Sequence, residues 1–238
     1  MPFYSDLFIY LFLLSGVIIS YTTRKLTLAG AITGGLVGLL IYKGAGYSGL
    51  LMMSFFFIAG SWATGWHSQD KQTIPTVEND NSPRTAGQVV ANGGVAAILG
   101  GVTWCMPQYI TLMQLMIAGS LASATADTLS SELGTVYGRN FYNVLTFRKD
   151  QRGLDGVVSL EGTLTGVLGA GFIAVIYALF FGWGWPVCWV IIAGTIGNLA
   201  DSVLGAALER KHLIGNNLVN FLNTLVGAAV CGLLIYLV

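Results

Sequence analysis

Apolar segments of about 20 residues, the length that a helix needs to cross a bilayer, follow one another along this chain. Only 9% of the residues are charged, whereas soluble domains carry about 25%. Within hydrocarbon the backbone must satisfy its own hydrogen bonds, which only helices and closed barrels achieve. Segments of this length therefore predict an all-α, polytopic membrane protein.

We expect one integral membrane domain over residues 1–238, with about eight transmembrane helices. Several of these segments are rich in glycine, which predicts close helix packing along small-residue ridges. The first segment has no basic residues before it, so we interpret it as a retained span. The predicted spans are residues 3–22, 26–42, 46–66, 87–106, 109–130, 160–182, 186–208 and 217–237.

The basic residues support this count, because ten of the 11 fall in alternate loops and only Lys43 falls in the others. The positive-inside rule then places the long loops in the cytoplasm and both termini outside. We expect the inner (cytoplasmic) cell membrane. The net charge is zero, which gives no sign of a nucleic-acid partner, and a homo-oligomer is compatible with the sequence. The ten residues are Arg24, Lys25, Lys71, Arg84, Arg139, Arg148, Lys149, Arg152, Arg210 and Lys211.

Two aspartates occupy corresponding places in similar segments. Asp127 follows the run Ile-Ala-Gly-Ser at 117–120, and Asp201 follows Ile-Ala-Gly-Thr at 192–195. A third copy of the run lies at 58–61. We infer three helical hairpins built on one plan. The alternative is chance, because membrane helices reuse few residue types.

Both aspartates fall at the predicted cytoplasmic ends of their spans, and Glu132 lies close after Asp127. An intramembrane carboxylate is costly and usually marks a functional site. The helix dipole also disfavours acids at helix C-termini, so a cation must compensate. Mg²⁺ is commonly held by one or two carboxylates together with substrate phosphates. We therefore predict that Asp127, Glu132 and Asp201 bind Mg²⁺; the alternative is an Asp–Arg pair that only fixes helix packing.

Basic and amide side chains on the same face could bind phosphate. Arginine forks and glycine-backed amides suit this role, although the basic residues could simply reflect the positive-inside rule and the amides could only join helices. Glu209 and His212 stay unassigned. There is no Walker A sequence, and the GxGxxG match at 44–49 lacks the required strand. The predicted phosphate-binding residues are Arg84, Asn92, Arg148, Lys149, Asn198 and Asn220.

Several stretches resemble an integral-membrane family, of the type called domain of unknown function 92, that includes plant phytyl-phosphate kinase. They are SPRTAGQVVANGG (82–94), SATADTLSSELGTVYG (123–138), RGLDGVVSLEGTLTG (152–166), GNLADSVLGAALE (197–209) and NNLVNFLNTLVGA (216–228). The order of acids also resembles, more distantly, CDP-diacylglycerol synthases and CTP-dependent dolichol or phytol kinases.

This resemblance implies a membrane phosphotransferase that converts an isoprenyl monophosphate to its diphosphate. A nucleotide, with CTP favoured, would donate the phosphoryl group, and Mg²⁺ would assist. Asp127, Glu161 and Arg152 would then be the catalytic residues. The chain length of the lipid and the identity of the nucleotide do not follow from the sequence.

Two alternatives remain open at this point. One is a CTP:lipid cytidylyltransferase, which would release pyrophosphate. The other is a transporter of a small anion or lipid, because transporters also use repeated hairpins and polar groups within the membrane. Transporter sites lie near the bilayer midplane, whereas these acids are predicted at one face.

Overall fold

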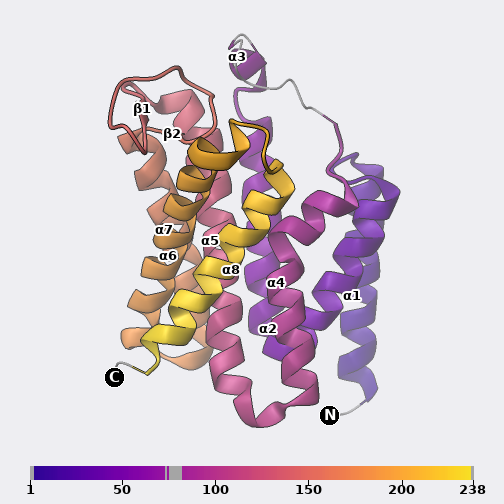
Figure 1. Cartoon of the computed structure of the whole chain (residues 1–238). Helices are drawn as coiled ribbons and strands as arrows, with labels where there is room; N and C mark the ends of the chain where they lie inside the picture. Colours follow the sequence, from indigo (N-terminus) through magenta and orange to yellow (C-terminus); the bar gives the residue numbers. More distant parts are fainter. Residues whose placement is uncertain (1–2, 73, 75–81, 237–238) are drawn as a thin grey trace.

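The computed structural model describes residues 3–72, 74 and 82–236, which are almost entirely helical (Figure 1). The elements are α1 (Phe3–Thr22), α2 (Leu28–Gly65), α3 (Ser68–Gln72), α4 (Ala86–Cys105), η1 (Pro107–Tyr109), α5 (Ile110–Tyr137), β1 (Tyr142–Asn143), β2 (Val157–Val158), α6 (Leu160–Phe181), α7 (Trp185–Leu204), the π-helical turn η2 (Gly205–Glu209) and α8 (Asn216–Leu234). The two short strands pair antiparallel.

Helix α2 is a hairpin of two arms that reverses at Gly46. The φ of 61° and ψ of −144° at this residue suit glycine, which has no Cβ to clash. Both ends of α2 meet Arg84: the Thr27 N–H donates to the Arg84 carbonyl at 3.0 Å, and the Arg84 guanidinium donates to Thr64 Oγ1 at 3.1 Å. The arms at 28–45 and 47–65 therefore run in opposite directions.

The described helices confirm the predicted all-α, polytopic membrane fold. Six are long and apolar enough to cross a membrane, and Leu7–Thr22 adds a shorter apolar helix. With the arms of α2 counted separately, the described chain holds apolar segments at all the predicted places. The helices differ from the predicted spans at one end: α5 continues to Tyr137, beyond the predicted span end at 130. Helix α7 passes after Leu204 into the π-helical turn η2, so the continuous helix Trp185–Glu209 contains the predicted span 186–208.

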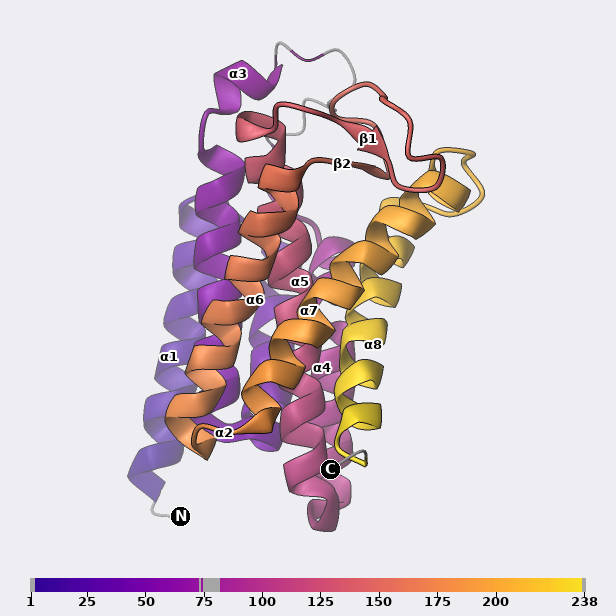
Figure 2. The ribbon, with the colours of Figure 1, turned by 90° about the vertical axis from the view of Figure 1, so that its left-hand side faces the viewer.

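The two ends of the bundle differ sharply. The described chain begins and ends at the same end of the bundle, where the connections are short, namely the reversal at Gly46, η1 and residues 182–184 (Figure 1). The long connections, with α3 and the two strands, gather at the opposite end (Figure 2). The ten basic residues of the alternate loops belong to these long connections, as the sequence predicted.

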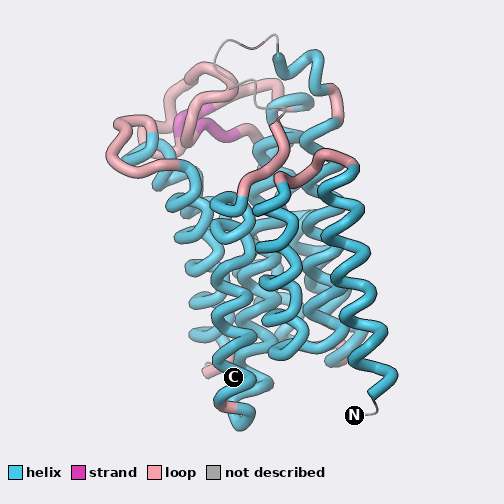
Figure 3. Tube along the Cα trace, turned by 90° about the vertical axis from the view of Figure 1, so that its right-hand side faces the viewer, coloured by secondary structure: helices cyan, strands magenta, loops and turns pink. Residues whose placement is uncertain are grey.

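Helix α5 forms the centre of the bundle, and packs against α2, α4, α6, α7 and α8. The helices run roughly parallel to one another (Figure 3). The middle of α5 is buried and rich in small residues, and the backbone of α8 approaches it closely: a Cβ on Gly119 would lie 2.6 Å from the Gly227 carbonyl oxygen. The consecutive pairs α5–α6 and α7–α8 are in contact, while the inferred three-fold repeat stays a prediction.

Candidate functional site

A polar pocket of about 410 Å³ opens within the end of the bundle that carries the long loops. Its walls come from α4, α5, α7, η2, α8 and the segment 153–159. The pocket gathers residues that are more than 130 positions apart in the sequence, so only the folded bundle creates it. Seven residues singled out from the sequence line it: Arg84, Asn92, Asp127, Glu132, Asn198, Asp201 and Asn220.

The two repeated aspartates meet in this pocket. The carboxyl groups of Asp127 on α5 and Asp201 on α7 share a hydrogen bond. Glycines allow this approach, since a Cβ on Gly197 of α7 would lie 1.9 Å from Ser123 Oγ of α5. Two ionised carboxylates in contact repel, so a pair like this holds either a proton or a cation. The juxtaposition makes the pair a candidate cation site.

Asn223 of α8 is a site residue that the sequence reasoning did not choose. Its Nδ2 donates to Asp201 Oδ1 at 2.7 Å, and its Oδ1 accepts from Ser123 Oγ at 3.0 Å. The side chain is fully buried. Asn223 therefore joins α5, α7 and α8 and fixes the Asp201 carboxylate. Its spacing of three from Asn220 was the available signal, but spacing could not show which amide faced the acid.

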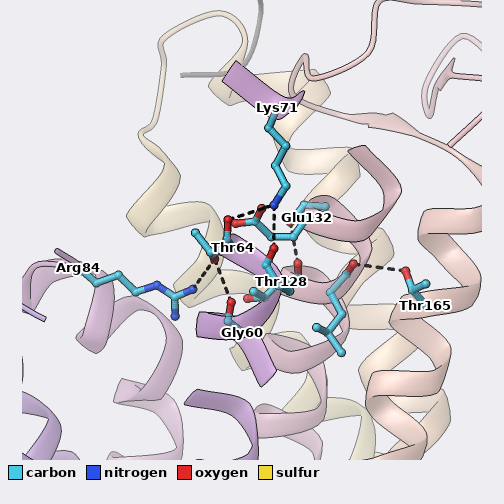
Figure 4. Close-up of polar contacts among 10 residues, drawn as sticks. Gly60, Thr64, Lys71, Arg84, Thr128, Glu132 and Thr165 are labelled. Atoms are coloured by element: carbon cyan, nitrogen blue, oxygen red, sulfur yellow. Dashed lines mark hydrogen bonds and ion pairs between the residues drawn. The ribbon is translucent and has the colours of Figure 1, made fainter. Parts of the chain in front are cut away.

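Glu132 lines the same pocket as the aspartate pair and forms an ion pair with a lysine (Figure 4). Lys71 Nζ, from the short helix α3, contacts Glu132 Oε2 at 2.5 Å and donates to the Ala63 carbonyl at 2.7 Å. The Lys71 side chain is only 8% exposed and that of Glu132 24%. The lysine thus neutralises Glu132 and satisfies the C-terminal carbonyls of α2. It was known from the sequence only as a basic loop residue.

Arg84 is held rigidly at the edge of the pocket. Its backbone N–H donates to the Lys25 carbonyl at 3.0 Å and its carbonyl accepts from Thr27 at 3.0 Å. The guanidinium reaches Thr64, as Figure 4 shows, and passes over Gly60, where a Cβ would lie 3.6 Å from a guanidinium nitrogen. Burial lowers the pKa of Arg84, and the charge of Glu132 raises it. This geometry presents a fixed cation to an anionic ligand.

The predicted asparagines occupy three walls of the pocket. Asn92 of α4 donates through Nδ2 to the Gln88 carbonyl at 2.9 Å, while its buried Oδ1 has no partner. Asn198 is buried on α7 one turn before Asp201, against Gly166. Asn220 of α8 donates to Asn216 Oδ1 at 3.2 Å. These groups can orient phosphate or sugar oxygens.

The other predicted residues do not line the pocket. Arg148 and Lys149 are exposed in the loop between β1 and β2. The Arg152 guanidinium lies 6.0 Å from the centre of the Phe141 ring, and Phe141 itself lines the pocket. Glu161, in the first turn of α6, accepts from the Arg139 N–H at 3.4 Å. Of the basic residues predicted to bind phosphate, Arg84 alone therefore lines the pocket in this conformation.

The segment between α5 and α6 covers the pocket, and hydrogen bonds from Arg210 hold this segment in place. Arg210 donates to Asp150 Oδ2 at 2.7 Å and to the Asp155 carbonyl at 3.1 Å. The hydrogen bond from Arg210 lowers the pKa of Asp150. Gly156, with φ of 72°, packs against η2, where a Cβ would lie 2.2 Å from the Ala206 side chain. Asp155 and Glu209 add further acids to the lining.

The arrangement suits a metal that arrives with phosphates rather than one held by protein alone. Among the described residues, no group of three His, Cys, Asp or Glu side chains lies close enough to hold a metal ion. Asp127 and Asp201 nevertheless supply the one or two carboxylates that Mg²⁺ typically uses beside phosphate oxygens and water. In this conformation Glu132, the third predicted ligand, is engaged by Lys71.

Comparison with known proteins gives relatives along nearly the whole chain. An uncharacterized membrane protein of Methanocaldococcus jannaschii is 35% identical over 219 residues, which cover 90% of this chain and 87% of the relative. The chloroplastic protein VTE6 of Arabidopsis thaliana is 31% identical over 86% of this chain. The match spans 64% of VTE6, slightly under two thirds of its length.

A second Arabidopsis thaliana protein, PGR, is 29% identical over 80% of this chain and 74% of its own length. No solved structure gives a significant match. The family described as integral membrane protein DUF92 matches residues 11–228. Because this match covers almost the entire bundle, the chain belongs to the DUF92 family of integral membrane proteins.

Proposed function

We propose that this protein is a membrane phosphotransferase that converts an isoprenyl monophosphate to its diphosphate with a nucleotide donor, CTP favoured. One observation carries the proposal: a single pocket contains the hydrogen-bonded pair Asp127–Asp201 together with Arg84. Membership of a family that includes plant phytyl-phosphate kinase, stated above as a resemblance, supplies the substrate class.

In the proposed reaction, an oxygen of the lipid phosphate attacks the γ-phosphorus of the nucleotide. The bond from the γ-phosphorus to the bridging oxygen breaks, and the nucleoside diphosphate leaves with that oxygen. Even as the monoanion, the lipid phosphate has an ionised oxygen that can attack, so no strong base is needed. Such transfer depends mainly on positioning and charge neutralisation.

Different residues of the pocket would bind the metal, bind the lipid phosphate and orient its oxygens. Asp127 and Asp201 would hold Mg²⁺, which when bound neutralises the phosphate oxygens. Arg84 would bind the lipid phosphate, and Asn92, Asn198 and Asn220 would orient oxygens around it. Asn223 keeps the Asp201 carboxylate in place. The positive-inside rule puts this end of the bundle in the cytoplasm, where nucleotides are found.

The position of the pocket favours an enzyme over a transporter. Transport sites lie near the bilayer midplane, between helices that can rock. Here the polar pocket lies at the ends of α5 and α7 and is roofed by a loop.

The decisive experiment uses purified full-length protein in lipid nanodiscs with an isoprenyl monophosphate, Mg²⁺ and CTP or ATP labelled at the γ-phosphate. We expect labelled isoprenyl diphosphate and unlabelled nucleoside diphosphate. Release of pyrophosphate would instead identify a cytidylyltransferase. Absence of any product, with movement of the lipid phosphate across liposomes, would overturn the proposal in favour of a transporter.

A further inference from the structure

A second cavity, almost entirely apolar, lies beside the polar pocket. It has a volume of about 610 Å³ and is walled by α1, both arms of α2 and the start of α4. Its lining is mainly aliphatic and aromatic, with Phe12, Phe56 and Phe57 among its larger side chains. This volume falls within the range of about 300–1,000 Å³ that is typical of small-molecule sites.

The cavity is long in the direction of the helices. On α1 its lining runs from Thr23, near the polar loops, to Phe8. At about 1.5 Å per residue this is about 22 Å, compared with about 30 Å for the whole hydrocarbon core of a bilayer. The cavity therefore suits an extended chain and is longer than one leaflet is thick.

The two cavities share one boundary, formed by Arg84, Gln88 and Asn92. Gln88 and Asn92 are four residues apart and lie on one side of the first turns of α4, and Arg84 lies just before the N-cap of that helix. Thus a guanidinium and two amides separate an apolar channel from an acidic, polar pocket. This is the arrangement that an amphiphile with an anionic head requires.

Asn92 gives an independent sign of a ligand at this boundary. Its Oδ1 is buried without a hydrogen-bond partner. Its Nδ2 donates to the Gln88 carbonyl, which fixes the orientation of the amide because a flip would set two oxygens against each other. A buried acceptor without a donor is unfavourable. A protonated phosphate oxygen on a ligand would supply the missing donor.

We propose that the apolar cavity binds the hydrocarbon chain of a single-chain lipid monophosphate, with its phosphate at Arg84 and a P–OH donating to Asn92 Oδ1. This rests on the proposed function for the identity of the head group and adds where the chain lies. A tail held between α1 and α2 brings the phosphate to the wall of the Asp127–Asp201 pocket, at the depth where the nucleotide would bind.

Photo-crosslinking tests the location of the chain. The probe is an isoprenyl monophosphate with a diazirine at the end of the chain, added to the full-length protein in nanodiscs without nucleotide. We expect adducts within residues 8–17 or 47–58, competed by unlabelled isoprenyl monophosphate. Adducts confined to α6–α8, or equal competition by phosphatidylglycerol, would show a bilayer lipid instead and overturn the proposal.

Two matched glycines allow a test by binding. A Cβ on Gly16 meets nothing within 4 Å, and Gly16 lines the cavity; a Cβ on Gly171 of α6 is equally free, but Gly171 lies outside the lining. Gly16→Phe should weaken binding of the isoprenyl monophosphate on the order of ten-fold, while Gly171→Phe should not. Equal affinities in the two variants would overturn the proposal.

A second variant protects the test if Gly16→Phe fails to fold. Gly34 also lines the cavity, and a Cβ there would lie 3.7 Å from Leu26 Cδ1, an ordinary contact. Gly34→Leu should weaken binding in the same direction. Because binding is measured without nucleotide, a protein that binds the chain but transfers no phosphoryl group would refute the proposed reaction and leave the chain site intact.

Discussion

The polar pocket and the apolar cavity are built from different parts of the chain. Most of the apolar lining comes from residues 8–58, whereas most of the polar lining comes from residues 127–220. They meet at the start of α4. The comparison teaches that recognition of a hydrophobic chain and phosphate chemistry can be changed separately, except at Arg84, Gln88 and Asn92, where one substitution should affect both.

The largest effect is expected from the aspartate pair. Asp127→Asn or Asp201→Asn removes a carboxylate from the proposed Mg²⁺ site, and turnover should fall on the order of 10³-fold, as when other key transition-state charges are removed. The measurement is kcat for isoprenyl diphosphate formation. Asp70→Asn, at the surface beside His67, is the matched control. Chain binding should persist in both pocket variants; its loss would mean that the two cavities are not separable.

Arg84→Gln should affect both cavities. It leaves the lipid phosphate without its guanidinium, so kcat/KM should fall on the order of 10²-fold, and affinity for the lipid monophosphate should fall as well. Arg84→Lys should recover only part of the lost kcat/KM and lipid affinity, because an ammonium lacks the planar fork of donors that binds two oxygens. Arg24→Gln, exposed at the same end of the bundle, serves as control. Normal lipid affinity in Arg84→Gln would show that Arg84 does not bind the lipid phosphate.

Asn223→Ala should weaken the binding of Mg²⁺ without changing the affinity of the apolar cavity for the hydrocarbon chain. Partners that orient a metal ligand are typically worth about 10- to 100-fold in metal affinity, and Asn223 holds Asp201 Oδ1. A Mg²⁺ titration of activity measures the shift. Asn220→Ala, which removes an amide bonded to Asn216 instead, should change the KM for nucleotide more than the Mg²⁺ dependence. Identical Mg²⁺ curves for wild type and Asn223→Ala would contradict this role.

The smallest effect is expected at the roof of the polar pocket. The Asp150–Arg210 pair is partly exposed, and ion pairs near the surface contribute little, so Asp150→Asn should increase hydrogen exchange of the segment 139–159 by about two- to five-fold. Arg210 lowers the pKa of Asp150, so the pair stabilises the docked loop above the ordinary pKa of aspartate. That stabilisation is lost as the pH falls through the lowered pKa. Wild-type exchange should rise there, and a similar rise in Asp150→Asn would exclude the pair as the cause.

Much of the fold could be predicted because membrane helices can be identified in a sequence by their length and hydropathy. The reversal at Gly46, η1 and the turn at 182–184 lie within one residue of the predicted short loops at 43–45, 107–108 and 183–185. The end of α5 could not be placed, since its last turns are polar yet helical. Ser130, Glu132 and Thr135 of these turns line the polar pocket, so composition marks the membrane boundary and not the end of the helix.

The candidate site was predictable where the helix itself sets the geometry. Asp127, Asp201 and Asn198 follow from helical spacing and from the similar segments. The loop residues Arg148, Lys149 and Arg152 were predicted from charge alone, and charge does not determine where a loop folds. Asn223 was missed because its role depends on how α8 is rotated within the bundle, where Gly227 packs closely on Gly119 of α5.

The short connections at the end that carries the termini have a consequence for biosynthesis. The reversal at Gly46, η1 and residues 182–184 expose very little polar backbone. Each pair of helices joined there can enter the bilayer as a preformed hairpin, with almost no hydrophilic chain to carry across. In the orientation that the positive-inside rule predicts, the polar loops and the pocket stay on the side on which the ribosome makes them.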